Sequence, residues 1–347
     1  MLNFCTLFNS NYLSRGLALF ESLKKVSPDF HLYIVAFDEE CHQYLEELHE
    51  SGLTIISLAD FEDEELKRVK SGRTVAEYCW TCTSSVILYC IEKFQLPSCT
   101  YLDADMIFYE DPLILIQEMV NESILITEHR YIRDYDVSAT HGKYCVQFMY
   151  FKNDENGLIA LRWWRDRCLE WCFAYLEDGK FGDQLYLNDW PERFRGVHVL
   201  QHPGGGLAPW NIQQYLPEKR DGRIFISDKT KGATYPVVFF HFHGLKFFSD
   251  EKVACSGALY ELGREVKEIF YFPYIRRLLE IGNQITRSGF SRNPQGALQP
   301  APSHWKTIFE YAKNILFLMQ KGNLPLFKRR LFSIRLHDHI YKLNSIK

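Results

Sequence analysis

Leu32-Tyr-Ile-Val-Ala-Phe37 is an uninterrupted apolar run that ends in Asp38. The run is short and rich in residues that favour β-structure, so it predicts a strand buried on both faces. Residues 2–8 predict another strand, and the helix expected between the two has an apolar face made of Leu13, Leu17 and Phe20. This order predicts a βαβ unit, the opening of an α/β fold with a mainly parallel sheet.

The rest of the chain continues the alternation of helices and strands. Further helices are predicted at about 39–50, 60–70, 74–94, 155–177 and 183–190, and further strands at 53–58, 99–103, 123–127, 146–151 and 237–242. From about residue 266, helical stretches and a segment rich in Gly, Pro, Ser and Asn (288–304) precede a basic amphipathic region. We therefore expect an α/β body at 1–268 and a helical, basic region at 269–347.

In sheets of this kind, ligands bind at the carboxyl ends of the strands. The residues that follow the first two predicted strands therefore form a candidate nucleotide site, which comprises Phe8, Asn9, Asn11, Tyr12 and Asp38.

Two carboxylates, Asp103 and Asp105, lie where the predicted strand 99–103 ends. Residues two apart on an extended chain project from the same face, and a pair of carboxylates can share a hard divalent cation with a phosphate. A second such pair, Asp134 and Asp136, has no strand leading into it, so we interpret it as a surface loop. Solvated turn acids remain the alternative for the first pair.

The predicted strand 237–242 ends in a second group of candidate residues. His241 can complete the coordination of Mn²⁺ or Mg²⁺ beside two carboxylates. Gly244 lets the backbone turn and approach a ligand, and Lys246 supplies a positive charge for a diphosphate. The alternative is that His241 and His243 are a pair of core histidines.

Two further segments are less specific. Asp183-Gln184 follows a glycine, and Asp183 is either a ligand-facing acid or the N-cap of a short helix. Gly204-Gly-Gly206 precedes Trp210 and Asn211. The glycines can bring the backbone close to a ligand while Trp210 stacks on a sugar, or they form a flexible turn beside a core tryptophan.

Taken together, over roughly residues 3–250, these motifs resemble the GT-A glycosyltransferases, most closely glycosyltransferase family 8 and its uncharacterised bacterial relatives. The resemblance identifies the segment Phe8–Tyr12 with the nucleotide-base segment of that family. It implies that Asp103, Asp105 and His241 are metal ligands and that Lys246 binds the diphosphate. It also implies that Asp183 and Gln184 lie next to the transferred sugar.

The chain departs from the family pattern at several positions. Leu185 stands where the family often has a second acid, and Phe247-Phe248 replaces a Pro-Trp pair after Lys246. Ser84 and Ser85 lie where the family has a basic residue in the helix before the acid pair. Gln147 lies in place of an Asn-Ala-Gly or Asn-Ser-Gly segment, and we expect it to take over a polar contact there.

The resemblance implies a metal-dependent enzyme that uses Mn²⁺ or Mg²⁺ and moves a hexose-type sugar from a nucleotide sugar, most simply a UDP-sugar. It further implies retention of anomeric configuration and a glycan or lipid-linked glycan acceptor. Asp183, Gln184 and Lys246 would then be catalytic, and Gln147, Trp210 and Asn211 would contact the acceptor or the sugar. The alternative is a non-catalytic nucleotide- or glycan-binding relative, which would have lost a metal ligand.

Composition agrees with a folded chain. Of the 347 residues, 46% are hydrophobic and 15% aromatic, which argues against disorder. Most of the ten cysteines lie in apolar stretches, so we expect reduced, buried thiols and a cytoplasmic location. The N-terminus has no basic region or cleavage site typical of a signal peptide, and the apolar runs are too short to span a membrane.

Charge is distributed unevenly. Residues 271–347 carry 13 Lys and Arg against 3 Asp and Glu, which leaves 27 against 41 in residues 1–270. The basic region 305–347 suits a helix on an anionic membrane surface, which would make the protein peripheral to the membrane. Docking of this region on the acidic body is the alternative. No motif indicates nucleic-acid binding.

Overall fold

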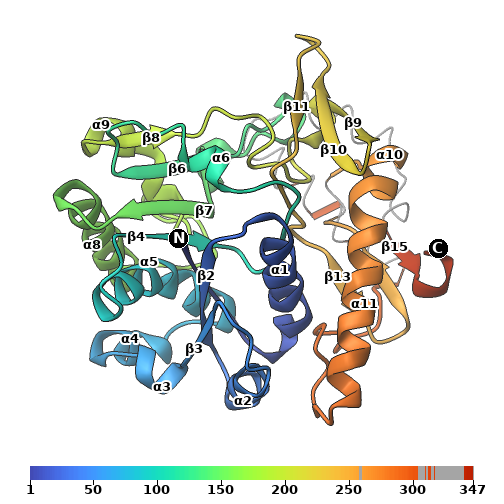
Figure 1. The fold of residues 1–347 in the computed structure, drawn as a ribbon, viewed down its shortest axis with the longest axis horizontal. Helices are drawn as coiled ribbons and strands as arrows, with labels where there is room; N and C mark the ends of the chain where they lie inside the picture. Colours follow the sequence, from blue (N-terminus) through green and yellow to red (C-terminus); the bar gives the residue numbers. More distant parts are fainter. Residues whose placement is uncertain (258–259, 304–308, 310–311, 314–315, 317–339, 347) are drawn as a thin grey trace.

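The computed structural model describes residues 1–257, 260–303, 309, 312–313, 316 and 340–346. At its centre is a seven-stranded sheet in the order β3-β2-β1-β4-β7-β6-β8 (Figure 1). Its strands are β1 (Leu2–Phe8), β2 (Phe30–Ala36), β3 (Leu53–Ser57), β4 (Ser98–Leu102), β6 (Ile124–Glu128), β7 (Tyr144–Lys152) and β8 (Val197–Val199). β7 runs antiparallel to both neighbours, and the other pairs are parallel. The predicted α/β class with a mainly parallel sheet is confirmed.

The central strand β1 is buried on both faces, as its apolar sequence predicts. Phe4 and Phe8 face a core that includes residues of α1 (Leu13–Val26) and α2 (Glu39–Glu47). Cys5 and Leu7 face the opposite core, against α5 (Val75–Lys93) and α8 (Glu155–Glu170). The alternation of side chains along the strand therefore supplies two helical layers, which lie on either side of the sheet in Figure 1.

Three predicted helices differ from the observed ones. The helix predicted at 60–70 is split into α3 (Leu58–Phe61) and α4 (Glu64–Lys70), because the Asp63 carboxylate accepts hydrogen bonds from the first turn of α4 and starts it anew. The helix predicted to reach residue 177 ends at Glu170, since Trp171 is extended and turns into the core. The helix predicted at 183–190 is a 3-10 turn, η3 (Leu185–Asp189), followed by α9 (Trp190–Arg193).

Smaller sheets surround the main one. β5 (Met106–Phe108) pairs with β12 (Phe239–His241), and β13 (Lys246–Phe248), β14 (Lys252–Ala254) and β15 (Ile340–Lys342) form another sheet. A three-stranded sheet of β9 (Tyr215–Arg220), β10 (Arg223–Asp228) and β11 (Thr234–Pro236) was not predicted, because its sequence is largely polar and lacks a clear apolar alternation. The remaining short helices are η1 (Ser10–Tyr12), α6 (Leu113–Ile116), η2 (Arg133–Tyr135), α7 (Ser138–His141), η4 (Ile212–Gln214) and η6 (Leu343–Ser345).

A continuous helical run follows the sheets, comprising α10 (Arg264–Val266), a π-helical turn (η5, Lys267–Tyr271) and α11 (Phe272–Arg287). In Figure 1, α11 lies alongside α1, and an Arg277–Glu21 ion pair of 2.7 Å joins the two helices. The apolar face of α11 belongs to the same core cluster as β12. The boundary predicted after residue 268 therefore falls inside a helical run that packs on the body.

The predicted membrane-binding region 305–347 lies outside the described residues, except for 309, 312–313, 316 and 340–346. Within the described part of the chain, every helix is too short or too polar to cross a bilayer.

Candidate functional site

The two acids of the first pair follow β4, at the centre of the main sheet. Asp103 donates its backbone N–H to the carbonyl oxygen of Gln147 on the neighbouring strand β7, at 3.1 Å. The chain then enters β5, whose antiparallel pairing with β12 sets His241 opposite Met106. This register brings His241 beside Asp105, although the two residues are far apart in the sequence.

The three predicted metal ligands converge. His241 Nε2 lies 3.1 Å from an oxygen of Asp105 and 3.7 Å from an oxygen of Asp103. One ligand atom from each side chain lies within 4.8 Å of the other two. The side chain of His241 is only 5% exposed, whereas the side chain of Asp103 is 29% exposed and that of Asp105 is 14% exposed. The group is therefore anchored from within and open to a ligand on the carboxylate side.

The three groups alter one another's pKa. Burial raises the pKa of Asp103 to about 6. At Asp105, burial acts in the same direction, but the charge and hydrogen bond of His241 outweigh it and lower the pKa to about 2. Burial opposes protonation of His241, yet the carboxylates, Asp105 first, hold its pKa well above the ordinary value. The protonated imidazole thus offsets the negative charge of the carboxylates, a role that a bound cation would otherwise fill.

The donor set fits a hard or borderline divalent cation such as Mn²⁺ or Mg²⁺. Behind the imidazole, His241 Nδ1 lies 2.7 Å from the amide oxygen of Gln147, which is fully buried. An amide oxygen can only accept a hydrogen bond, so Nδ1 carries the proton and Nε2 faces the two carboxylates. This is the arrangement by which a second residue orients a metal-binding histidine. Gln147, predicted to contact acceptor or sugar, is placed behind His241.

Asp183 lies next to this group. Its side chain is 5% exposed, and burial together with the charge of Asp103 raises its pKa to about 7. The backbone carbonyl of Asp183 accepts a hydrogen bond of 2.8 Å from the indole N–H of Trp164, which fixes the segment from the side of α8. Asp183 is thus a third carboxyl group, within electrostatic reach of Asp103.

Gln184 is oriented differently from Asp183. Its amide nitrogen donates to the backbone carbonyl of His141 at 2.6 Å and so ties the segment to the end of α7. The alternative interpretation of Asp183 as a helix cap is wrong, because η3 begins at Leu185 with Gln184 at its N-cap and no capping side chain.

The predicted nucleotide segment forms the turn from β1 into α1. Phe8 is buried and packs under Gly16, where an added Cβ would overlap its ring at 2.2 Å. The Asn9 side chain accepts a hydrogen bond of 3.1 Å from the backbone N–H of Asn11. Tyr12 is 41% exposed, and its partial burial and the charge of Asp105 raise its pKa. The structure therefore brings Tyr12 within electrostatic reach of the acid pair.

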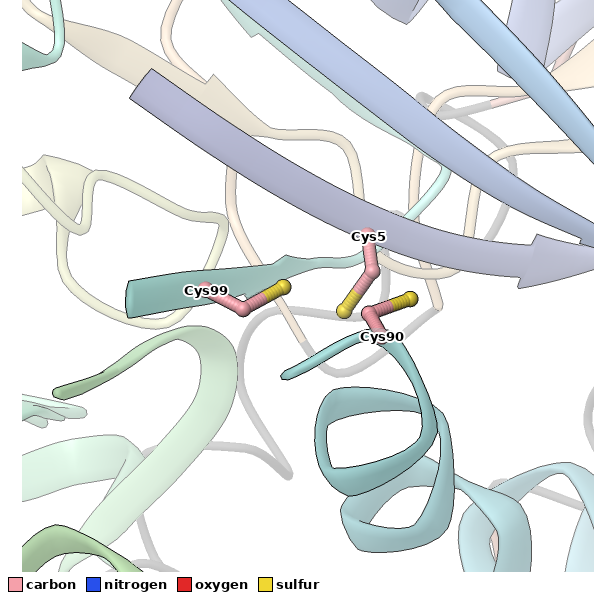
Figure 2. A group of neighbouring side chains, drawn as sticks. All are labelled: Cys5, Cys90 and Cys99. Atoms are coloured by element: carbon pink, nitrogen blue, oxygen red, sulfur yellow. The ribbon is translucent and has the colours of Figure 1, made fainter. Parts of the chain in front are cut away.

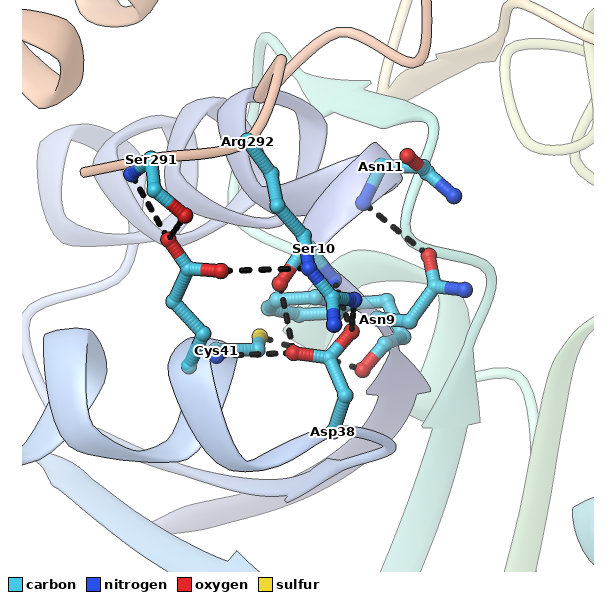
Figure 3. Close-up of polar contacts among 9 residues, drawn as sticks. Asn9, Ser10, Asn11, Asp38, Cys41, Ser291 and Arg292 are labelled. Carbon is cyan, nitrogen blue, oxygen red and sulfur yellow. Dashed lines mark hydrogen bonds and ion pairs between the residues drawn. The ribbon is translucent and has the colours of Figure 1, made fainter.

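Asp38 joins this turn to β2 and α2 (Figure 3). Its carboxylate accepts hydrogen bonds from the backbone N–H of Ser10 at 2.9 Å, from the Ser10 hydroxyl at 2.5 Å and from the backbone N–H of Cys41 at 2.9 Å. Burial opposes ionisation of Asp38, but the Ser10 hydrogen bonds lower its pKa. Asp38 therefore shapes the turn and caps α2 at the same time.

Trp210 and Asn211 are both buried. The Trp210 ring packs against His241 and His243, with centroids 5.5 and 5.4 Å apart. The amide of Asn211 is bonded to backbone throughout, because it donates to the carbonyls of His129 and Gly206 and accepts from Ala208 N–H. Trp210 thus forms part of the wall beside the predicted metal ligands, and Asn211 holds the preceding loop.

The glycine segment before Trp210 has a packing role. A Cβ on Gly204 would lie 1.9 Å from the carbonyl oxygen of Pro236, so only glycine fits against that strand. Gly244, after His241, has φ +78°, a backbone conformation that favours glycine. Lys246 is exposed at the start of β13, with Nζ 5.8 Å from the centroid of the Phe248 ring.

Some site residues were missed from the sequence. The pKa of buried Tyr101 is raised by burial and by the charges of Asp103 and Asp183, so its hydroxyl lies within electrostatic reach of both acids. Tyr101 lies two residues before Asp103, on the same strand face, and this spacing could have identified it. Arg15 is 2% exposed and donates to the carbonyl of Leu245, which links α1 to the His241 segment. No sequence signal pointed to that link.

A second group of metal-binding residue types was also missed. Cys5 of β1, Cys90 of α5 and Cys99 of β4 bring their sulfur atoms within 4.8 Å of one another (Figure 2). All three are fully buried in the apolar core, and all ten described cysteines are free thiols. Burial raises the pKa of Cys5 and Cys90 well above the ordinary value, so these thiols stay protonated at neutral pH.

No family model matches the chain. Two curated proteins of Bacillus subtilis (strain 168) are similar to it, and both are described as uncharacterized. YfnD is 30% identical over 284 residues, which cover 80% of this chain and 88% of YfnD. YfnF is 32% identical over 259 residues, which cover 72% of this chain and 84% of YfnF.

Several solved structures are also similar to the chain. The galactosyltransferase LgtC, in complex with donor and acceptor sugar analogs, is 13% identical with a TM-score of 0.46 and covers 80% of this chain and 96% of LgtC. Mouse xyloside xylosyltransferase 1 is 13% identical with a TM-score of 0.41, and the match covers 69% of this chain and 97% of the mouse protein. The glycosyltransferase GlyE of Streptococcus pneumoniae is 13% identical with a TM-score of 0.44, and the match covers 87% of this chain and 66% of GlyE.

Proposed function

The chain belongs to the family of YfnD and YfnF, and we propose that it is a metal-dependent GT-A glycosyltransferase. In this proposal it moves a hexose-type sugar from a UDP-sugar to a glycan or lipid-linked glycan, with retention of anomeric configuration. The observation that supports it most is the convergence of Asp103, Asp105 and His241 at the end of β4, with Gln147 orienting the imidazole.

Asp103, Asp105 and His241 would hold Mn²⁺ or Mg²⁺. When bound, such an ion stabilises negative charge on a departing diphosphate as a Lewis acid, an effect worth several kcal/mol. Lys246 would add a positive charge on the same phosphates. These residues address the main chemical difficulty of the reaction, which is the charge that develops on the nucleoside diphosphate when its bond to the sugar breaks.

Asp183 would act on the sugar. The anomeric carbon develops positive charge during transfer, and a carboxylate close to it lowers the energy of that state. With a pKa of about 7, Asp183 is only partly ionised near neutral pH, because it is buried beside Asp103. A cation bound to Asp103 would favour the ionised form of Asp183. Metal binding and ionisation of Asp183 would therefore support each other.

Calorimetric titration of the purified protein with UDP, GDP and dTDP, with and without Mn²⁺, tests the proposal. We expect one nucleotide, UDP, to bind only when the metal is present. Absence of binding for all three nucleotides, in protein shown to be folded, would contradict the proposal and favour a non-catalytic relative. Binding without donor turnover in the presence of candidate acceptors would also favour the non-catalytic alternative.

The region beyond residue 268 would be a helical appendage of the catalytic body, and its basic part would bind the cytoplasmic face of an anionic membrane. The net positive charge of residues 271–347 supports this part of the proposal. We expect the protein to sediment with vesicles containing phosphatidylglycerol and to be released from them by truncation after residue 303. Equal sedimentation of the full and truncated chains, or none of either, would contradict the membrane interpretation.

A further inference from the structure

The segment Ser291–Gly296, which follows α11, lies directly on the turn from β1 into α1. The backbone N–H of Ser14 donates to the carbonyl of Pro294 at 3.1 Å, and Arg15 donates to the carbonyl of Gln295 at 3.2 Å. A Cβ on Gly296 would lie 3.1 Å from the carbonyl oxygen of Asn11. Residues distant in sequence thus pack closely on the predicted nucleotide segment.

The same segment places the positively charged side chain of Arg292 at the carboxyl ends of β1 and β2. Arg292 Nη1 lies 3.2 Å from an oxygen of Asp38, and Arg292 Nε lies 3.1 Å from an oxygen of Glu40. The other oxygen of Glu40 accepts 2.7 Å hydrogen bonds from the backbone and the hydroxyl of Ser291. Figure 3 shows the Arg292 side chain reaching from this segment to Asp38.

Both oxygens of Asp38 are occupied in this arrangement. One accepts hydrogen bonds from the Ser10 hydroxyl and the backbone N–H of Cys41, and the other from the backbone N–H of Ser10 and from Arg292. The Asp38 side chain is 18% exposed, whereas Arg292 is 53% exposed. Asp38 therefore holds the turn in place through its hydrogen bonds, and Arg292 contacts the same carboxylate from the solvent side.

Arg292 is suited to this position by its geometry. A guanidinium carries five N–H donors in a rigid plane, and among the described residues its contacts use Nη1 and Nε. One arginine can therefore bridge Asp38 and Glu40 and keep further donors directed at solvent. A lysine, with a single ammonium group, cannot reproduce both contacts in the same plane.

We propose that Ser291–Gly296 forms one wall of the nucleoside-binding site and that Arg292 is a positioning residue, which acts through Asp38 on the turn Asn9–Tyr12. The inference rests on the proposed function, because it names a further part of the same donor site. It concerns the nucleoside half of the donor alone. In the proposed function, the diphosphate half is held by Lys246 and by the cation that Asp103, Asp105 and His241 would bind, so it does not depend on Arg292.

Two separate titrations in the presence of Mn²⁺, one with UDP and one with inorganic pyrophosphate, distinguish the nucleoside half from the diphosphate half. We expect Arg292→Ala to weaken UDP binding about tenfold and to leave pyrophosphate binding and the melting temperature unchanged. Arg292→Lys should recover part of the UDP affinity. Arg287→Ala removes an arginine from the end of α11, five positions away, and serves as the matched control with unchanged affinity for both ligands.

The outcomes distinguish the inference from the proposed function. If the wild-type protein binds neither UDP nor another nucleoside diphosphate, the proposed function fails. If the wild-type protein binds UDP and Arg292→Ala binds it equally well, the inference fails and the proposed function stands. Equal weakening of UDP and pyrophosphate, or a lowered melting temperature, would likewise overturn the inference, since either result indicates a general structural role.

Discussion

The acid cluster (Asp103, Asp105 and His241) and the thiol cluster (Cys5, Cys90 and Cys99) each bring three ligand-type side chains within 4.8 Å. Their surroundings differ. The acid cluster lies where the chain leaves the sheet, and its carboxylates stay partly exposed, whereas the thiols lie within β1, α5 and β4 and are fully buried. Proximity of ligand atoms is therefore insufficient for a metal site, and access at the end of a strand distinguishes the two clusters.

The two clusters also differ in how their side chains are supported. His241 is oriented by Gln147 and compensates two acids, so the acid cluster already contains a cationic position. The thiols lie together within an apolar core, and the described residues that influence Cys5 and Cys90 include no cationic side chain. Buried cysteines in such surroundings behave as small apolar residues. We therefore expect the acid cluster to bind metal and the thiol cluster to contribute packing.

The largest expected effect comes from breaking the acid cluster. Asp105→Ala removes a predicted metal ligand while leaving the backbone pairing of β5 with β12 in place, so turnover should fall at least ~10²-fold without loss of fold. Asp136→Ala, in the second acid pair on the exposed loop, is the matched control and should retain full activity. Steady-state kinetics and circular dichroism measure both effects. A fully active Asp105→Ala enzyme would exclude the acid cluster as the metal site.

A smaller effect is expected from the residue that orients His241. Gln147→Leu leaves the Nδ1–H of His241 buried without an acceptor, so the affinity for Mn²⁺ should fall by roughly 10- to 100-fold. Gln147→Glu keeps an acceptor and should retain more affinity than the leucine variant. Metal titration, followed through nucleotide binding, measures the change. Unchanged metal affinity in Gln147→Leu would show that the imidazole needs no such support.

Breaking the thiol cluster should affect stability alone. Cys90→Ala removes a buried sulfur atom from a packed core and should lower the free energy of unfolding by about 1–2 kcal/mol, with nucleotide binding unchanged. Cys79→Ala, at a half-buried position on the same helix, should cost less. Denaturant unfolding and elemental analysis provide the readout. A metal ion that copurifies with the wild-type protein and is lost in Cys90→Ala would reverse our interpretation of the thiol cluster.

The smallest effect concerns His129, which packs on Trp210 in the wall beside the acid cluster. Burial lowers the pKa of His129 to about 3, so the folded state holds it neutral while the unfolded state takes up a proton below about pH 6.5. The contribution of His129 to stability is therefore complete above pH 6.5 and is lost as the pH falls towards 3. Between pH 7 and pH 6 the expected loss is below about 1 kcal/mol.

Thermal unfolding at a series of pH values measures this slope. In His129→Gln the corresponding part of the slope should disappear, because glutamine does not titrate. A slope identical to that of the wild-type protein would assign the pH dependence to other groups.

The class of fold and the place where a site could form follow from patterns in the amino-acid sequence. Apolar runs such as Leu32–Phe37 can be satisfied only when both faces are covered, which requires a sheet between helical layers. The acid pair after β4 was recognisable because strand ends at one edge of a sheet are where ligands bind. The helix limits near Trp171 and the polar strands β9–β11 were not, since tertiary packing overrides weak local preference there.

Contacts between residues that are distant in the sequence depend on tertiary packing. The register of β5 with β12 places His241 on Asp105, the packing of β7 puts Gln147 behind that imidazole, and the return of the chain sets Arg292 on Asp38. Tertiary packing also gathered Cys5, Cys90 and Cys99, which no spacing in the sequence relates. Local sequence specifies local geometry, whereas contacts between distant segments depend on how complete layers pack against one another.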